Sequence, residues 1–259
     1  MNEELYKLNN ELVDLVGDLF AQGFPHYKNW SDAQWYLMFA FIKSYRTINS
    51  VLILCERSNG QDAFVLVRTL FELMVNTQYV FQEDTDEKLR LFNEYDWVLR
   101  DRMLTNALDN EQTAKLLESR VKGINLEEIK NRAVNYLKTY KKGEKKYGSW
   151  TKKSIAELAN ETGLKDLYKS LYELGSQFVH SNSRAMNEYI KRTDSGEIIF
   201  QTYESDGYIK ESLVGSFCCF LSVVNWVNKI FELTYEDKLN DLYERYKKLS
   251  EEPNPELTI

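Results

Sequence analysis

Histidine is scarce in this sequence. Only His26 and His180 occur among the 259 residues, so acid–base chemistry by imidazole has two possible centres. His26 stands beside Pro25 in an expected turn and has no obvious partner. His180 closes an expected helix in LYKSLYELGSQFVHSNSR, with Asn182 just after it. There it either satisfies the last carbonyl groups of the helix or acts as a general base, and it is the candidate catalytic histidine.

Arg68 and Glu72 are the only charged residues between Asp62 and Glu83. They are four positions apart, so they share one face of an expected helix and can form an ion pair. An unpaired charge in so apolar a helix would be unfavourable by several kcal/mol, on the order of the desolvation penalty of a buried ion. The pair is therefore either a structural salt bridge between helices or an anion site in which Glu72 orients the Arg68 guanidinium.

Tyr168, Tyr172 and Ser176 follow one another at intervals of four residues, on the flank of the helix that ends at His180. Aromatic pairs at this spacing either pack together or line a ligand site. We keep both interpretations and treat these three residues as candidate binding or orienting residues.

The segment 138–153 carries seven lysines and a single acidic residue. With its two glycines it is expected to be a mobile basic loop, which is either a solvated surface or a nucleic-acid contact. Aromatic side chains in the same segment could stack on unpaired bases. The candidate contact residues are Lys141, Lys142, Lys145, Lys146 and Trp150.

Several kinds of site are excluded by missing motifs. GxxxxGK[ST], GxGxxG, HExxH and GxSxG are all absent, which argues against the common nucleotide-binding, zinc-protease and esterase sites. Two distant histidines and the apolar-flanked Cys55, Cys218 and Cys219 do not form a zinc site, and we predict no metal and no cofactor. A site made of carboxylates alone stays open. The net charge of −7 argues against a surface that binds polyanions throughout.

The composition predicts an all-α protein. Only 11 glycines and 3 prolines occur, and two of the prolines lie in the last seven residues. Apolar spacing predicts a helical bundle of about eight helices. Between positions 189 and 203, β-branched and aromatic residues flank Asp194-Ser195-Gly196, which predicts one short β-hairpin. The main expected helical segments are 4–21, 32–57, 61–81, 86–108, 125–140, 154–163, 164–180, 208–233 and 235–250.

We expect one domain over residues 1–259, with N-terminal helices (1–57), a core (61–182), C-terminal helices (208–250) and a tail (251–259). The uncharged stretch from Ser212 to Asn228 is just short of a membrane span and contains polar residues, so it is interpreted as a buried core helix. The N-terminus lacks a secretory pattern, and we expect a cytoplasmic protein without a membrane partner. The aromatic-rich segment from Trp35 to Phe41 makes a homodimer plausible.

Two blocks of the sequence resemble a bacterial family known as domain of unknown function 5677. The first is AFVLVRTLFEL; the second is Trp150, SIAELANETG and LYKSLYELGSQFVHSN, so the resemblance covers about Gln61 to Asn182. It implies that Arg68, Glu72, Tyr172 and His180 converge in one pocket. The resemblance implies no known activity. Gly175-Ser176-Gln177 departs from the expected pattern and leaves the position of the family's serine open.

A looser similarity is to the HEPN superfamily of helical ribonucleases, although no arginine stands four to six residues before either histidine, so their direct motif is missing. The first hypothesis is a metal-independent ribonuclease in phage defence or a toxin system, with RNA as partner. His180 would be its general base, and Arg68 would stabilise the phosphorane charge. The alternative is a non-enzymatic helical module that binds a partner protein or a small anionic ligand.

Overall fold

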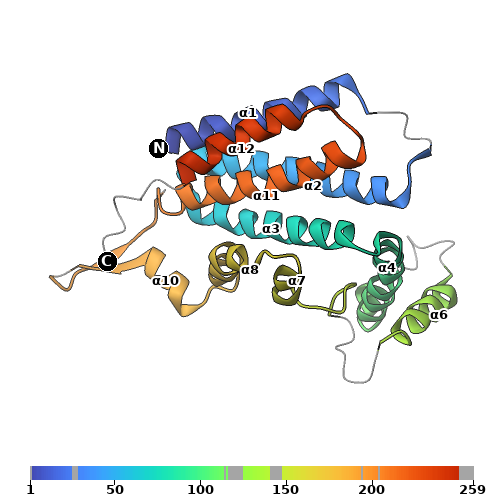
Figure 1. Cartoon of the computed structure of the whole chain (residues 1–259). Coiled ribbons are helices and arrows are strands. Elements are labelled where there is room, and N and C mark those ends of the chain that lie inside the picture. Colours follow the sequence, from blue (N-terminus) through green and yellow to red (C-terminus); the bar gives the residue numbers. More distant parts are fainter. Residues whose placement is uncertain are drawn as a thin grey trace. The chain divides into compact units, whose positions relative to one another are not determined.

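The computed structural model describes residues 2–24, 29–113, 115, 125–140, 148–193, 195–203 and 205–250. Within these ranges it contains eleven α-helices, one π-helical segment and a two-stranded sheet (Figure 1), so the all-α prediction is confirmed. About eight helices were expected, and the nine expected segments become eleven helices because segment 164–180 is divided by the π-helical segment and the short helix Ser183–Tyr189 was not predicted. The chain divides into two compact units, one formed by Met1–Tyr79 with Ala159–Ile259 and the other by Val80–Leu158, and we describe each separately.

Long helices build the first unit. They are α1 (Asn2–Gln22), α2 (Asp32–Glu56), α3 (Gly60–Gln82, as far as Tyr79), α11 (Ile209–Ile230) and α12 (Glu236–Ser250). The expected apolar stripe of α1 is confirmed, since Leu5, Leu8, Leu12 and Val16 are fully buried. At the start of α2, the Ser31 side chain accepts from the Gln34 backbone N–H, and the Gln34 side chain accepts from the Ser31 backbone N–H. This capping box explains why the helix begins there.

Helix α11 packs against α1, α2 and α12, and most of its apolar side chains are buried. Fully buried Asn9 of α1 donates to the Leu213 carbonyl at 3.1 Å and accepts from the Ser216 hydroxyl at 3.1 Å. These bonds fix α1 against α11 without leaving a buried polar group unpaired. Helices α2 and α11 are each long and apolar enough to cross a membrane by length and composition. Because 61% of the apolar window of α11 is buried inside the unit, its role as a core helix accounts for that composition.

The rest of the first unit consists of short elements. They are α7 (Ile155–Glu161, from Ala159 onward), α8 (Lys165–Leu167), a π-helical segment (Tyr168–Glu173), α9 (Leu174–Val179), α10 (Ser183–Tyr189), β1 (Ile190–Arg192) and β2 (Ile198–Phe200). The strands pair antiparallel, with Ile190 opposite Phe200, so the predicted hairpin is confirmed. Gly196 has a φ of +88°, which a residue with a side chain rarely adopts, and this glycine permits the turn.

The second unit contains α4 (Thr85–Leu108) and α6 (Leu126–Leu137), which pack against each other. The buried Tyr136 hydroxyl donates to the Trp150 carbonyl at 3.0 Å, and the Trp150 ring meets the Phe92 ring edge-on at 5.5 Å. Trp150 is 9% exposed. Its ring is thus part of the core of this unit and is not displayed for base stacking, contrary to the expected role of Trp150 in nucleic-acid contact.

Candidate functional site

Arg68 forms three interactions in the first unit. Its Nη2 lies 3.1 Å from Oε1 of Glu72 and donates to the Tyr172 hydroxyl at 2.7 Å. The guanidinium carbon also lies 4.4 Å from the centroid of the Tyr172 ring, within cation–π range. We call Arg68, Glu72 and Tyr172 the arginine clamp. Its ion pair lies within α3, and the contact from Arg68 to Tyr172 joins α3 to the π-helical segment.

The clamp is closely packed. A Cβ at Gly175 would lie 3.1 Å from Cβ of Arg68, so the absence of a side chain at Gly175 lets α9 approach α3. The Tyr168 and Tyr172 rings stack at 5.2 Å, and the Ser176 hydroxyl donates to the Tyr172 carbonyl at 2.7 Å. The three candidate residues therefore have local contacts. The Tyr168 and Tyr172 rings pack on each other, Ser176 hydrogen-bonds within its own helix, and Tyr172 contacts α3 through Arg68. Burial is the main cause that raises the pKa of Tyr168.

His180 lies at the end of the helix that contacts Arg68. It is exposed, follows α9 as its C-cap, and its backbone N–H donates to the Ser176 carbonyl. The Arg68 guanidinium contacts Tyr172, and the Arg68 stem packs at Gly175. Among the described residues the structure therefore joins Arg68, Glu72 and Tyr172, and it gives no hydrogen bond or ion pair between His180 and this group.

Asn182 has a local role. Its side chain accepts hydrogen bonds from the backbone N–H groups of Arg184 and Ala185, which makes it the N-cap of α10. It also donates to the Gln177 side chain. Both contacts stabilise the turn between α9 and α10. The predicted contact residues Lys141, Lys142, Lys145 and Lys146 lie outside the described residues.

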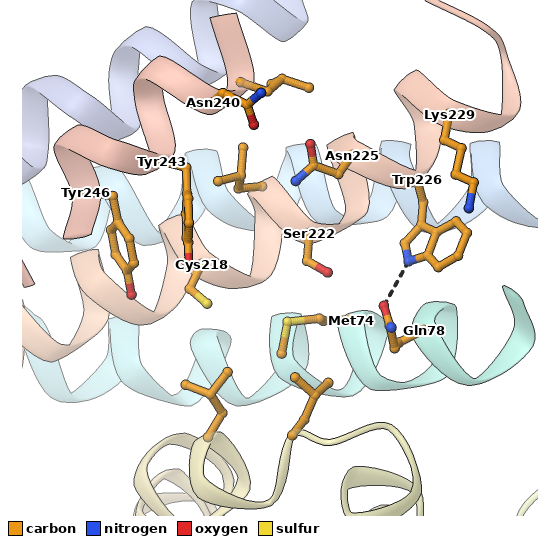
Figure 2. Close-up of a pocket in the computed structure, with 14 residues that line it drawn as sticks. Met74, Gln78, Cys218, Ser222, Asn225, Trp226, Lys229, Asn240, Tyr243 and Tyr246 are labelled. Atoms are coloured by element: carbon orange, nitrogen blue, oxygen red, sulfur yellow. Dashed lines mark hydrogen bonds between the residues drawn. The ribbon is translucent and has the colours of Figure 1, made fainter. Parts of the chain in front are cut away.

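A pocket of about 530 Å³ lies in the first unit between α3, α8 and the adjoining loop, α11 and α12, and Figure 2 shows its lining. Its apolar walls come mainly from leucines and Met74 of four segments. The volume is that of a small-molecule site. The residues that line it are Met74, Gln78, Leu164, Leu167, Cys218, Leu221, Ser222, Asn225, Trp226, Lys229, Leu239, Asn240, Tyr243 and Tyr246.

Polar groups gather at one end of this pocket. The Trp226 indole N–H donates to Gln78 at 3.0 Å, and the Lys229 ammonium lies 4.9 Å from the centroid of the Trp226 ring. Asn225 and Lys229 are exposed beside them (Figure 2). Among the described residues that line the pocket, Lys229 is the one charged side chain. The pocket thus offers apolar walls and a single cation, within a chain of net charge −7.

Sulfur and phenol groups at the other end are held in their protonated forms. Burial raises the pKa of the Cys218 thiol, and burial is also the main cause that raises the pKa of the Tyr246 hydroxyl. Both side chains line this end of the pocket. A protonated thiol is a poor nucleophile, so this end of the pocket can enclose a ligand but is not activated for covalent chemistry. The three cysteines are free, as expected, and Cys55 and Cys219 are buried.

Four residues of the pocket lining come from one face of α11. Ser222, Asn225, Trp226 and Lys229 are spaced by three, one and three residues, which places them on one face of α11. The polar face of such a helix ordinarily lies toward solvent, so this spacing marks where α11 leaves the core and does not by itself indicate a pocket. Within the part of the chain that the structure describes, no group of three or more His, Cys, Asp or Glu residues could hold a metal ion.

Comparison with known proteins identifies the class of this helical protein. The profile of a family of unknown function (DUF5677) matches residues 34–198, more than half of the chain. The chain therefore belongs to this family, and the resemblance seen in the sequence is confirmed. No curated protein and no solved structure matches it significantly.

Proposed function

We propose that this protein is a non-enzymatic helical module that binds a small amphipathic anion in the pocket of Figure 2. The observation that carries the proposal is an apolar pocket of about 530 Å³ whose lining contains Lys229 and no acidic residue. A pocket of this volume has room for a small molecule, which a few polar groups can orient. The family has no known function, so membership in it does not decide between binding and catalysis.

The lining defines the chemistry of the ligand. Met74, Leu164, Leu167 and Leu221 suit an apolar and preferably planar body. The Lys229 ammonium suits a carboxylate or sulfonate at the other end, because a charge-assisted hydrogen bond is stronger beside apolar walls than in water. Asn225 adds an amide to the lining on the side of Asn240 (Figure 2).

The arrangement supports binding over catalysis. The arginine of the ribonuclease hypothesis is engaged by Glu72 and Tyr172, whereas His180 is exposed at the end of α9 and forms no hydrogen bond or ion pair with them among the described residues. The free thiols fit a reducing compartment, and the proposal places the module in the cytoplasm.

The proposal predicts charge-selective binding. We expect 2-naphthoate to bind the wild type more tightly than its neutral analogue 2-naphthamide in isothermal titration calorimetry. Lys229→Gln should weaken 2-naphthoate about 10-fold, as expected for the loss of one charge-assisted hydrogen bond, and should leave 2-naphthamide unchanged. Ser222→Trp, which fills the pocket, should abolish binding of both probes.

The matched control is Lys248→Gln, which removes an equal charge from exposed α12 outside the pocket lining and should leave both affinities unchanged. Equal affinity for the two probes would contradict the assigned role of Lys229. Failure of both probes to bind at millimolar concentration would contradict the proposed ligand class.

The rival ribonuclease hypothesis has its own test. We expect neither the wild type nor His180→Ala to cleave total RNA or tRNA, with or without EDTA, because the Arg68 guanidinium is already engaged by Glu72 and Tyr172. Denaturing gel electrophoresis of the RNA measures the result. Cleavage by the wild type that survives EDTA and disappears in His180→Ala would overturn the non-enzymatic module and would favour an effector in phage defence or a toxin system.

A further inference from the structure

The β-hairpin presents an apolar face to solvent. Residues paired across an antiparallel ladder point to the same side of the sheet, so Ile190, Phe200 and Ile198 share one face with Arg192. Ile190 is 41% exposed, Ile198 is 55% exposed and Phe200 is 65% exposed. A two-stranded hairpin is marginal by itself, and such a face is normally covered.

The two edges of this hairpin differ in their protection against pairing. The β1 edge carries Lys191 and Arg192, and charged side chains on an edge strand oppose the addition of another strand. The β2 edge is Ile198-Ile199-Phe200, with neither a charge nor a proline. The charges on β1 therefore oppose the addition of a strand, whereas the sequence of β2 allows another strand to pair with it.

The hydrogen-bond register shows which backbone groups are available at the β2 edge. The Thr193 N–H donates to Glu197 and the Gln201 N–H donates to Tyr189, both at 2.9 Å. Hydrogen-bonded pairs alternate along an antiparallel ladder, so Ile199 directs its backbone groups toward β1. The backbone N–H and C=O groups of Ile198 and Phe200 consequently point outward, away from the hairpin.

We propose that β2 pairs antiparallel with β2 of a second copy of this chain, about a twofold axis at Ile199. In this register Ile198 lies opposite Phe200 of the partner subunit, and their outward backbone groups match. The two Ile199 residues then form the intervening pair without hydrogen bonds. A four-stranded sheet results, in which the apolar faces of both hairpins become continuous.

A second copy is favoured over other partners because the edge is complementary to itself. Its hydrogen-bonding groups recur under the twofold rotation, and β2 brings no like charges together. The exposed apolar surface of α2 is not complementary to itself in this way. There Phe39 and Ile42 share a groove with Lys43 and Arg46, so a twofold pairing centred on the groove would bring like charges together.

The first experiment measures the oligomeric state of the full chain by sedimentation velocity. We expect a dimer for the wild type and at least 10-fold weaker association for Ile199→Lys, which places two ammonium groups at the axis. The matched Ile190→Lys, on β1, should weaken the dimer less. Circular dichroism checks that each variant remains folded. A monomeric wild type, or a dimer insensitive to Ile199→Lys, would overturn the proposal.

A second experiment tests the register even if the lysine variants fail to fold. Opposed residues in a pair without hydrogen bonds have Cα atoms about 4.5 Å apart, which a disulfide can bridge. Ile199→Cys should therefore form a disulfide-linked dimer under mild oxidation. Ile198→Cys lies opposite a different residue and should crosslink much more slowly. Equal crosslinking of the two variants, or none for Ile199→Cys, would contradict this register. Neither residue lines the pocket of Figure 2, so failure here is distinct from failure of ligand binding.

Discussion

Replacement of Gly60 by alanine should lower the free energy of unfolding by about 3 kcal/mol, at the severe end for one added methyl group in a packed site. A Cβ at this position would lie 2.0 Å from the Gly207 carbonyl oxygen and 2.8 Å from the Ile209 backbone nitrogen. Both are backbone atoms, so no side chain can rotate to make room. The start of α3 would have to separate from the start of α11.

That contact is also held by hydrogen bonds that the separation would break. The Ser212 hydroxyl donates to the Gly60 carbonyl at 3.2 Å, and the Ser205 N–H donates to the Ser58 carbonyl at 2.6 Å. A loss of stability is unusual for this substitution, because replacing glycine by alanine within a helix normally raises the free energy of unfolding by about 1 kcal/mol.

Gly17→Ala is the matched control for Gly60→Ala. Its added Cβ would meet only the Tyr45 hydroxyl, at an ordinary 3.6 Å, inside α1. We expect this variant to be stabilised by about 0.5 to 1 kcal/mol. Urea unfolding followed by far-ultraviolet circular dichroism measures both variants. A Gly60→Ala protein as stable as the wild type would contradict the close approach of α3 and α11.

Periodicity predicted the long helices because their buried faces repeat at helical spacing, as Leu5, Leu8 and Leu12 do in α1. It missed α10, in which Ala185 is the one buried residue, so the segment has no repeating apolar face. The signal for α10 is its N-cap Asn182, which the sequence equally allows as a site residue. The π-helical segment Tyr168–Glu173 has no signature in residue type, because its wider turn is set by packing.

The division into two units has no composition signal either. One boundary falls after Tyr79, inside α3, and the other follows Leu158, inside α7. Linkers are recognised by proline, glycine and polar residues, and a boundary within a helix needs none of them. A single expected domain was the natural inference from the sequence.

The arginine clamp could be predicted in part. The spacing of Arg68 and Glu72 predicted their ion pair, because residues four apart on a helix are neighbours. The participation of Tyr172 came only from the family resemblance, since it lies 104 residues away. The pocket was not predicted at all, because α3, α8, α11 and α12 are distant in sequence and periodicity describes one helix at a time.

Replacement of Arg68 by methionine should lower the free energy of unfolding by about 2 kcal/mol, less than the 3 to 5 kcal/mol typical when a fully buried ion pair loses one partner. The Arg68 side chain is 19% exposed, and its loss leaves the Tyr172 hydroxyl without this donor. The effect is moderated because Glu72 is 37% exposed and can be solvated. Methionine retains much of the apolar stem that packs against Gly175.

A double-mutant cycle separates the clamp from general packing. Arg68→Met, Tyr172→Phe and the double variant should show a coupling of about 1 kcal/mol in urea unfolding, because each single change removes the same hydrogen bond. Lys7→Met is the exposed control. Lys7 pairs with Glu3 at the same spacing on α1, in solvent, and its loss should not measurably change stability.

If Arg68→Met retained wild-type stability but lost binding of an anion, Arg68 would belong to a functional site and the structural role of the clamp would be wrong. A marked loss of stability with 2-naphthoate binding retained at low temperature would assign the clamp to the fold and the ligand to the pocket around Lys229.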